Sequence, residues 1–240
     1  MKPVIIHQTP EYFVINKPSG MATEPPSPMP TVRDWLIGQG YIKVGEWDEE
    51  SRYGIVHRLD TDTSGVLIWA KQPAAQQTLK TLWQGRQVKK TYLALVVGTT
   101  EPSGTIELAI ERDNQNDRQT VALLPSARSR PAITGYKTVG HSRIGEWAVS
   151  FVEATPITGR THQIRVHFKA IGHPLVGDKL YGERASDEVA KLLELNRQFL
   201  HAYQLSLPSG ETYQAELPSD LLTALRNVGF PSTITDTKGE

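Results

Sequence analysis

The stretch YGIVHRLDTDTSGVLIWAK, residues 53–71, joins a charged cluster, a turn and an apolar run. The charged cluster holds His57, Arg58 and Asp60, and the turn after it has the composition Thr-Asp-Thr-Ser-Gly. The apolar run GVLIWA, residues 65–70, has the length of a strand, which predicts a strand buried on both faces. Arg58 and Asp60 therefore lie just before a strand that is expected in the core, a position where charged side chains require an explanation.

The segments on either side predict an alternation of strands and helices. Because strands and helices interleave while several strands arrive in hairpins, we expect an α+β domain on a mixed, mainly antiparallel sheet with flanking helices. Expected strands cover 12–16 and 89–98, expected helices cover 31–40, 72–85, 186–200 and 219–229, and a hairpin is expected over 205–217. One domain is expected over 1–230, followed by a frayed tail over 231–240.

The composition is that of an ordinary globular protein: 240 residues, 38% hydrophobic and 22% charged, with a formal net charge of zero. The chain has no cysteine, which excludes disulfides, thiolate zinc sites and cysteine nucleophiles. No apolar run approaches the roughly 18 residues that span a membrane, and the N-terminus lacks the pattern of a signal peptide. We therefore expect a cytoplasmic protein without a membrane partner.

Charge is unevenly distributed along the chain although its total is zero. Residues 71–92 and 156–173 contain lysines and arginines but no acid, whereas residues 183–240 contain more acids than bases. If folding brings the two basic stretches together, they form one surface suited to a polyanion. Charge alone favours two solvated faces over one such surface.

A second informative stretch is TGRTHQIRVHFKAIGHP, residues 158–174. Wound as a helix, it has an apolar side and an opposite polar side that carries His162, Arg165 and Lys169. A strand also fits the pattern, and in either case Arg165 and Lys169 share a polar face. His162 and His167 are poorly spaced for a shared metal ion, and no zinc-binding motif is present, so we expect no metal site.

The residues by themselves leave few candidates for covalent chemistry. The chain lacks the G-x-S-x-G elbow of hydrolases and the glycine-rich loops that bind phosphates. The remaining candidate is Asp60. On local pattern alone, a turn-capping role for Asp60 is favoured over a catalytic one, although Asp62 fits the turn role better.

A series of motifs follows the same order as in one known family. They are VINKPSGM at 14–21, GIVHRLDTDTSGVLIWAK at 54–71, KKTYLALVVG at 89–98, TGRTHQIRVHFKAIGHPLVGDKLYG at 158–182 and LHAYQLSL at 200–207. Together they resemble the RluA-type branch of the pseudouridine synthases over nearly the whole chain. The resemblance implies the catalytic fold of that family, with a central cleft and without the small N-terminal RNA-binding domain that many relatives carry.

The resemblance implies three active-site residues. Asp60 would be the catalytic carboxylate, Tyr92 would stack on the target uracil and assist proton transfer, and Arg165 would pair with Asp60. The reaction breaks the N1–C1′ bond of a uridine, turns the uracil and makes a C5–C1′ bond, so it requires neither a cofactor nor a metal. It requires an ionised carboxylate, as a nucleophile or as a base at C2′, and both alternatives remain open. Without the resemblance, Tyr92 would be an ordinary strand aromatic.

The resemblance also explains the arginine beside the carboxylate. A uridine in folded RNA has to leave its stack to react, and the planar guanidinium of Arg58 would fill the gap. His57 is expected to orient the loop, and Lys17 to contact a backbone phosphate, although a solvated lysine fits as well. Further candidates for RNA binding are Lys89, Lys90, Arg160, His162 and Lys169. The expected partner is transfer RNA or large-subunit ribosomal RNA, bound by a monomer.

Two other functions compete with this interpretation. A retaining glycosidase would pair Asp60 with a second carboxylate about 5 Å away, for which Asp62 is the nearest candidate in sequence. A non-catalytic RNA-binding module would keep the fold but would have no reason to keep Asp60, Tyr92 and Arg165 together.

Overall fold

The computed structural model describes residues 2–48, 50–113, 118–122, 124 and 126–230. The expected tail over 231–240 lies outside these residues. The chain forms two compact units. Unit 1 comprises Met1–Tyr92, Thr155–His162 and Leu200–Glu216, and unit 2 comprises Leu93–Ala154, Gln163–Phe199 and Leu217–Glu240. The single domain expected over 1–230 stays a prediction.

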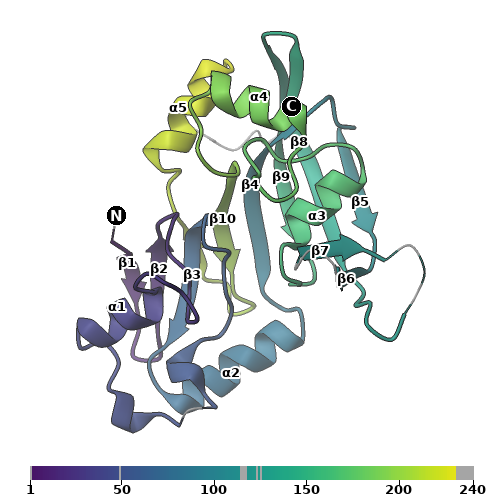
Figure 1. Ribbon diagram of the computed structural model, residues 1–240. Coiled ribbons are helices and arrows are strands. Elements are labelled where there is room, and N and C mark those ends of the chain that lie inside the picture. Colours follow the sequence, from purple (N-terminus) through teal and green to yellow (C-terminus); the bar gives the residue numbers. More distant parts are fainter. Residues whose placement is uncertain (1, 49, 114–117, 123, 125, 231–240) are drawn as a thin grey trace. The chain divides into compact units, whose positions relative to one another are not determined.

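Unit 1 is built on a mixed sheet in the order β1-β2-β3-β10, with β11 paired to β10 (Figure 1). The pair β3–β10 is parallel, and the pairs β1–β2, β2–β3 and β10–β11 are antiparallel. The strands are β1 (Val4–Gln8), β2 (Tyr12–Lys17), β3 (Ser64–Ala70), β10 (Leu200–Ser206) and β11 (Thr212–Gln214). This arrangement confirms the expected α+β class and the hairpin over 205–217.

Strand β3 forms the centre of the unit 1 core. All seven of its residues are buried, which confirms the strand predicted to be buried on both faces. Helix α2 (Pro73–Gln84) packs alongside β3, and helix α1 (Val32–Gly38) adds Val32 and Leu36 to the same core (Figure 1). The α1 helix begins at a capping box, in which Thr31 and Asp34 bond to each other's backbone N–H groups. Two short 3-10 helices, η1 (Val44–Glu46) and η2 (Arg52–Gly54), lead to the charged cluster.

The described residues of unit 2 form the sheet segment β4-β9-β8-β5, a separate pair β6–β7 and the helices α3, α4 and α5. Its strands are β4 (Lys89–Val97), β5 (Ser103–Glu107), β6 (Ile110–Asp113), β7 (Arg118–Val121), β8 (Ile133–Ile144) and β9 (Trp147–Pro156). Strand β4 begins in unit 1 and continues into unit 2, and the last residues of β9 belong to unit 1. The helices are α3 (Gln163–Ala170), α4 (Arg184–Leu192) and α5 (Ser219–Asn227).

The sequence left open whether residues 161–171 form a helix or a strand. In the structure they form a helix, α3. The expected polar side of this helix is not a solvated face, because Arg165 is buried together with most of α3. The helix expected over 186–200 begins earlier and ends earlier, as α4. Ser186, expected at its start, is buried inside α4, where its hydroxyl donates to the Leu175 carbonyl and accepts from the Gly177 N–H.

No helix in the described part of the chain combines the length and the apolar character that a membrane span requires.

Gly65 offers a direct test of the unit 1 packing. Its φ of +120° disfavours any side chain, and an added Cβ would lie 2.2 Å from the carbonyl oxygen of Ala202 on β10. We expect Gly65→Ala to lower the free energy of unfolding by at least about 2 kcal/mol, measured by urea titration. The matched control is Gly210→Ala, where φ is +107° and nothing lies within 4 Å of the new Cβ. Equal losses in the two variants would contradict the close approach of β3 and β10.

Candidate active site

The loop that carries Asp60 is fixed at its beginning by His57. The Nε2 atom of His57 accepts a hydrogen bond of 3.0 Å from the backbone N–H of Ile68 on β3, and the imidazole stacks on Trp83 of α2 at 4.6 Å between ring centroids. Burial, and after it the positive charge of Lys90, lowers the pKa of His57 to about 3. His57 is therefore a neutral hydrogen-bond acceptor at neutral pH. This supports its expected role in orienting the loop.

The backbone is also fixed on both sides of Asp60. The Thr23 hydroxyl donates to the Leu59 carbonyl at 2.9 Å and accepts from the Leu59 N–H at 3.1 Å. On the other side, the Lys17 ammonium donates to the Thr61 carbonyl at 2.9 Å. A turn follows, in which the Thr63 N–H donates to the Asp60 carbonyl. Asp60 thus has little backbone freedom, as accurate placement of a reacting group requires.

Lys17 occupies a different place from the phosphate-binding position expected from the sequence. It is fully buried, and its Nζ also donates to the carbonyls of Pro18 at 2.9 Å and Met21 at 2.7 Å. An ammonium group has three N–H donors, and the three carbonyls receive them. The sequence prediction was wrong because the carbonyls that receive this side chain come together only in the folded loop.

Residues from two distant segments, which carry Tyr92 and His162, lie near the Asp60 carboxylate. The Nε2 atom of His162 lies 3.8 Å from Oδ1 of Asp60, and both side chains are largely shielded from solvent. Burial, and after it the negative charge of Asp60, raises the pKa of the Tyr92 phenol above its ordinary value. Tyr92 is therefore protonated at neutral pH and can donate a hydrogen bond, but it is a poor base. The structure thus brings together Asp60, Tyr92 and His162 within unit 1.

Several of the expected RNA-binding cations also belong to unit 1. Lys89 and Arg160 are exposed, whereas Lys90 is half-buried and makes a long hydrogen bond of 3.5 Å to the Thr158 carbonyl. Burial lowers the pKa of Lys90 to about 8. Lys90 therefore carries its charge at neutral pH and loses it as the pH rises through this value.

Arg165 lies in unit 2, on α3, and is held by a residue that the sequence reasoning did not identify. Its Nε and Nη2 donate to Oδ2 and Oδ1 of Asp178 at 2.7 and 2.8 Å, and its guanidinium lies 5.0 Å from the ring centroid of Tyr181. Asp178 is fully buried, and its Oδ1 also accepts from the N–H groups of Leu180 and Tyr181. This bidentate pair fixes the plane of the Arg165 side chain. The pairing of Arg165 with Asp60 stays a prediction.

The sequence contains a weak signal for Asp178, and Lys169 lies in a different environment from the expected one. Asp178 follows a glycine within the motif GDKLYG at 177–182, where a buried carboxylate could have been suspected but no partner could be assigned. Lys169, expected on the polar side of the helix, is half-buried near the end of α3.

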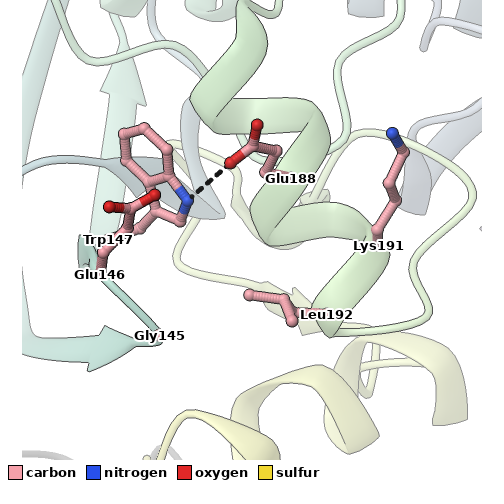
Figure 2. A pocket seen from close by; sticks show the side chains of 6 residues that line it. All are labelled: Gly145, Glu146, Trp147, Glu188, Lys191 and Leu192. Atoms are coloured by element: carbon pink, nitrogen blue, oxygen red, sulfur yellow. Dashed lines mark hydrogen bonds between the residues drawn. The ribbon is translucent and has the colours of Figure 1, made fainter.

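A pocket of about 530 Å³ in unit 2 is unsuited to RNA (Figure 2). Its lining residues are Gly145, Glu146, Trp147, Glu188, Lys191 and Leu192. The indole N–H of Trp147 donates to Glu188 at 3.2 Å (Figure 2). Two carboxylates against one ammonium disfavour a phosphate backbone, and no residue expected at the site is among those that line the pocket.

Among the residues that the structure describes, no group of three or more histidine, aspartate or glutamate side chains could hold a metal ion.

Comparison with known proteins agrees with the motifs. A family model described as RNA pseudouridylate synthase matches residues 11–170. The chain belongs to this family. The matched range contains Asp60, Tyr92 and Arg165, whereas Asp178 lies beyond it. Family membership leaves the glycosidase interpretation without support.

Curated relatives in the pseudouridine synthase family are longer than this chain. It is 41% identical over 221 residues to an uncharacterized RNA pseudouridine synthase of Chloroflexus aurantiacus, a match that covers 89% of the chain and 65% of the relative. It is 36% identical over 241 residues to the ribosomal large subunit pseudouridine synthase D of Nitrosomonas europaea, with 95% and 67% covered. The chain thus spans about two thirds of the length of these relatives.

Solved structures of pseudouridine synthases share the fold. Human RNA pseudouridylate synthase domain containing 4 matches with a TM-score of 0.74 at 25% identity, over 93% of this chain and 92% of that one. Human RNA pseudouridylate synthase domain containing 1 matches with a TM-score of 0.69 at 29% identity, over 91% and 84%. The expected pseudouridine synthase fold is therefore confirmed.

The buried ammonium of Lys17 can be tested by its removal. Lys17→Met removes a fully buried ammonium and leaves the carbonyls of Pro18, Met21 and Thr61 without their shared donor, so we expect the free energy of unfolding to fall by about 3 kcal/mol or more. Lys89→Met, at an exposed position in the same unit, should change it by less than about 0.5 kcal/mol. Urea titration of both variants measures the difference. A Lys17→Met protein as stable as the control would show that Lys17 does not hold the loop.

Proposed function

We propose that this protein is an RNA pseudouridine synthase that isomerises a uridine in structured RNA, with Asp60 as its catalytic carboxylate. The observation that carries the proposal is the position of Asp60: its loop is fixed on both sides, and its charge acts on the phenol of Tyr92. Relatives named for the ribosomal large subunit favour large-subunit ribosomal RNA as the substrate over transfer RNA. We expect the protein to act as a monomer in the cytoplasm.

The chemistry assigns distinct tasks to the charged and neutral groups. The Asp60 carboxylate attacks C1′ or removes the proton at C2′, and either step releases the uracil from its sugar. Tyr92, protonated at neutral pH, provides a flat surface and a hydrogen-bond donor for the detached base. Because the reaction rearranges bonds without a change in oxidation state, it requires no redox cofactor.

Arg165 would keep Asp60 ionised in its shielded position. Asp178 accepts hydrogen bonds from two of the N–H groups of the guanidinium. A guanidinium has five N–H groups, and we propose that the others reach the Asp60 carboxylate. In this arrangement Asp178 is a positioning residue, because it orients Arg165 and does not contact the uridine.

Arg58 would occupy the space that the target base leaves in the RNA stack. Its side chain is 61% exposed, so it is available to an incoming RNA. Lys89, Lys90 and Arg160 would bind backbone phosphates, which predicts an affinity that falls with salt concentration.

Asp60→Asn tests the catalytic carboxylate. The amide has nearly the same shape but is neither a nucleophile nor a base, so we expect the single-turnover rate to fall by roughly a thousandfold or more. RNA affinity and the free energy of unfolding should stay close to those of the wild type. Asp62→Asn, in the same turn, is the matched control and should remain active. Substantial turnover by a folded Asp60→Asn protein would refute the assignment.

Arg58→Ala tests base extrusion. A stacking contact with a base contributes about 1–3 kcal/mol, so the single-turnover rate on a folded stem-loop should fall by roughly tenfold or more. The loss should be much smaller on an RNA destabilised around the target uridine, because less stacking has to be overcome. Arg165→Ala should lower the rate on both RNAs, because its proposed partner is the catalytic carboxylate. An equal loss on both RNAs for Arg58→Ala would show that Arg58 does not replace the base.

A further inference from the structure

The carboxylate of Glu24 forms ion pairs with two arginines, Arg52 and Arg58. Glu24 follows the NKPSG turn in the chain, and its side chain is 11% exposed. The Nε atom of Arg52 donates to Oε2 of Glu24 at 2.6 Å, and Nη2 of Arg52 contacts Oε1. The Nη1 atom of Arg58 lies 3.7 Å from the same Oε1. Arg52 is thus held tightly by both oxygens, whereas Arg58 is held loosely at the edge.

Thr23 and Glu24 are adjacent in the chain, and they contact two adjacent residues of the catalytic loop, Leu59 and Arg58. Thr23 exchanges two hydrogen bonds with the backbone of Leu59, and Glu24 next to it faces the guanidinium of Arg58. The segment that contains Glu24 therefore sets the position of the Arg58 backbone through Thr23 and the direction of its side chain through the carboxylate.

An unusual backbone conformation at Arg52 accompanies the contact of this second cation with Glu24. Arg52 and Tyr53 both have positive φ values, +53° and +57°, which residues with a side chain adopt at a cost in free energy. Burial, and after it the positive charge of Arg58, lowers the pKa of Arg52. The two guanidinium groups therefore repel each other, and the carboxylate of Glu24 allows both to stay in this small region.

We propose that Glu24, fixed by Arg52, is a positioning residue that aims the Arg58 guanidinium before RNA binds and thereby sets how efficiently the target uridine is extruded. The inference rests on the proposed role of Arg58 as the group that replaces the base. A long arginine side chain loses conformational entropy when it is fixed in a complex. A contact that restricts its rotamers before RNA binds reduces the entropy that is lost on binding. The contact is long and solvent-exposed on the arginine side, so the RNA can displace it readily.

Glu24→Gln provides the test, because it keeps the shape of the side chain and removes the charge. The measurement is the single-turnover rate on the folded stem-loop and on the same RNA destabilised around the target uridine. We expect the rate on the folded RNA to fall by roughly three- to fivefold, less than in Arg58→Ala, and the rate on the destabilised RNA to stay close to that of the wild type. In an Arg58→Ala background, Glu24→Gln should add no further loss on the folded RNA, because the residue that it positions is gone.

The control is Glu46→Gln in the same unit. Glu46 forms an exposed ion pair with Lys43 at 3.4 Å, so its neutralisation removes the same charge away from the catalytic loop. Both rates should equal those of the wild type. If Glu24→Gln fails to fold, Glu24→Asp takes its place, because it keeps the charge but withdraws the carboxylate from Arg58. It should lower the rate on the folded RNA selectively.

Two results would overturn the inference and are distinguishable from failure of the proposed function. If Arg58→Ala is selective for folded RNA but Glu24→Gln lowers both rates equally, Glu24 only supports the loop. If the losses from Glu24→Gln and Arg58→Ala multiply in the double variant, Glu24 does not act through Arg58. If Arg58→Ala itself lowers both rates equally, the proposed role of Arg58 is wrong, and the inference is refuted together with it.

Discussion

The hydrogen bonds of the Lys17 ammonium hold the loop on which the rest of the candidate site depends. The ammonium is fully buried, and it joins the NKPSG turn to the backbone carbonyl of Thr61, which directly follows Asp60. A buried charge of this kind is stable only when its hydrogen bonds are satisfied, so the turn and the catalytic loop have to fold together. Thr23 and His57 add uncharged hydrogen bonds at the other end of the loop. The carboxylate of Asp60 is thus presented by a loop that both β2 and β3 support.

Around this loop the protonation states are set by burial. His57 is held neutral, Tyr92 is held protonated, and Lys90 has a pKa only moderately above neutrality. Burial therefore favours a neutral imidazole at His57 and a neutral phenol at Tyr92, and in the proposed reaction Asp60 is the ionised group. The two arginines that we propose for the site each contact a carboxylate within their own unit, Arg58 loosely with Glu24 and Arg165 tightly with Asp178. This difference matches their proposed tasks, because a group that enters the RNA has to move and a group that stabilises a charge does not.

Much of the fold follows from local patterns in the sequence. The helices expected over 31–40 and 72–85 and the buried strand expected over 65–70 were predicted correctly, because the capping box at Thr31, the proline that opens α2 and the apolar run of β3 are short-range signals. The sequence misplaced Ser186 and Lys17 because their partners are distant or are formed by backbone carbonyls, which no residue pattern records. Asp178 and the pairing of Glu24 with Arg58 were missed for the same reason. Asp60 itself was found through a family motif, since its local pattern alone favoured a turn.

The central claim is that this chain isomerises uridine in a structured RNA. The most direct measurement is a pseudouridine map of ribosomal and transfer RNA from cells with the gene removed and from cells with the gene restored. We expect a defined position in structured RNA, which we propose to lie in large-subunit ribosomal RNA, to lose its pseudouridine on removal of the gene and to regain it on restoration. Identical maps in the two strains would contradict the claim.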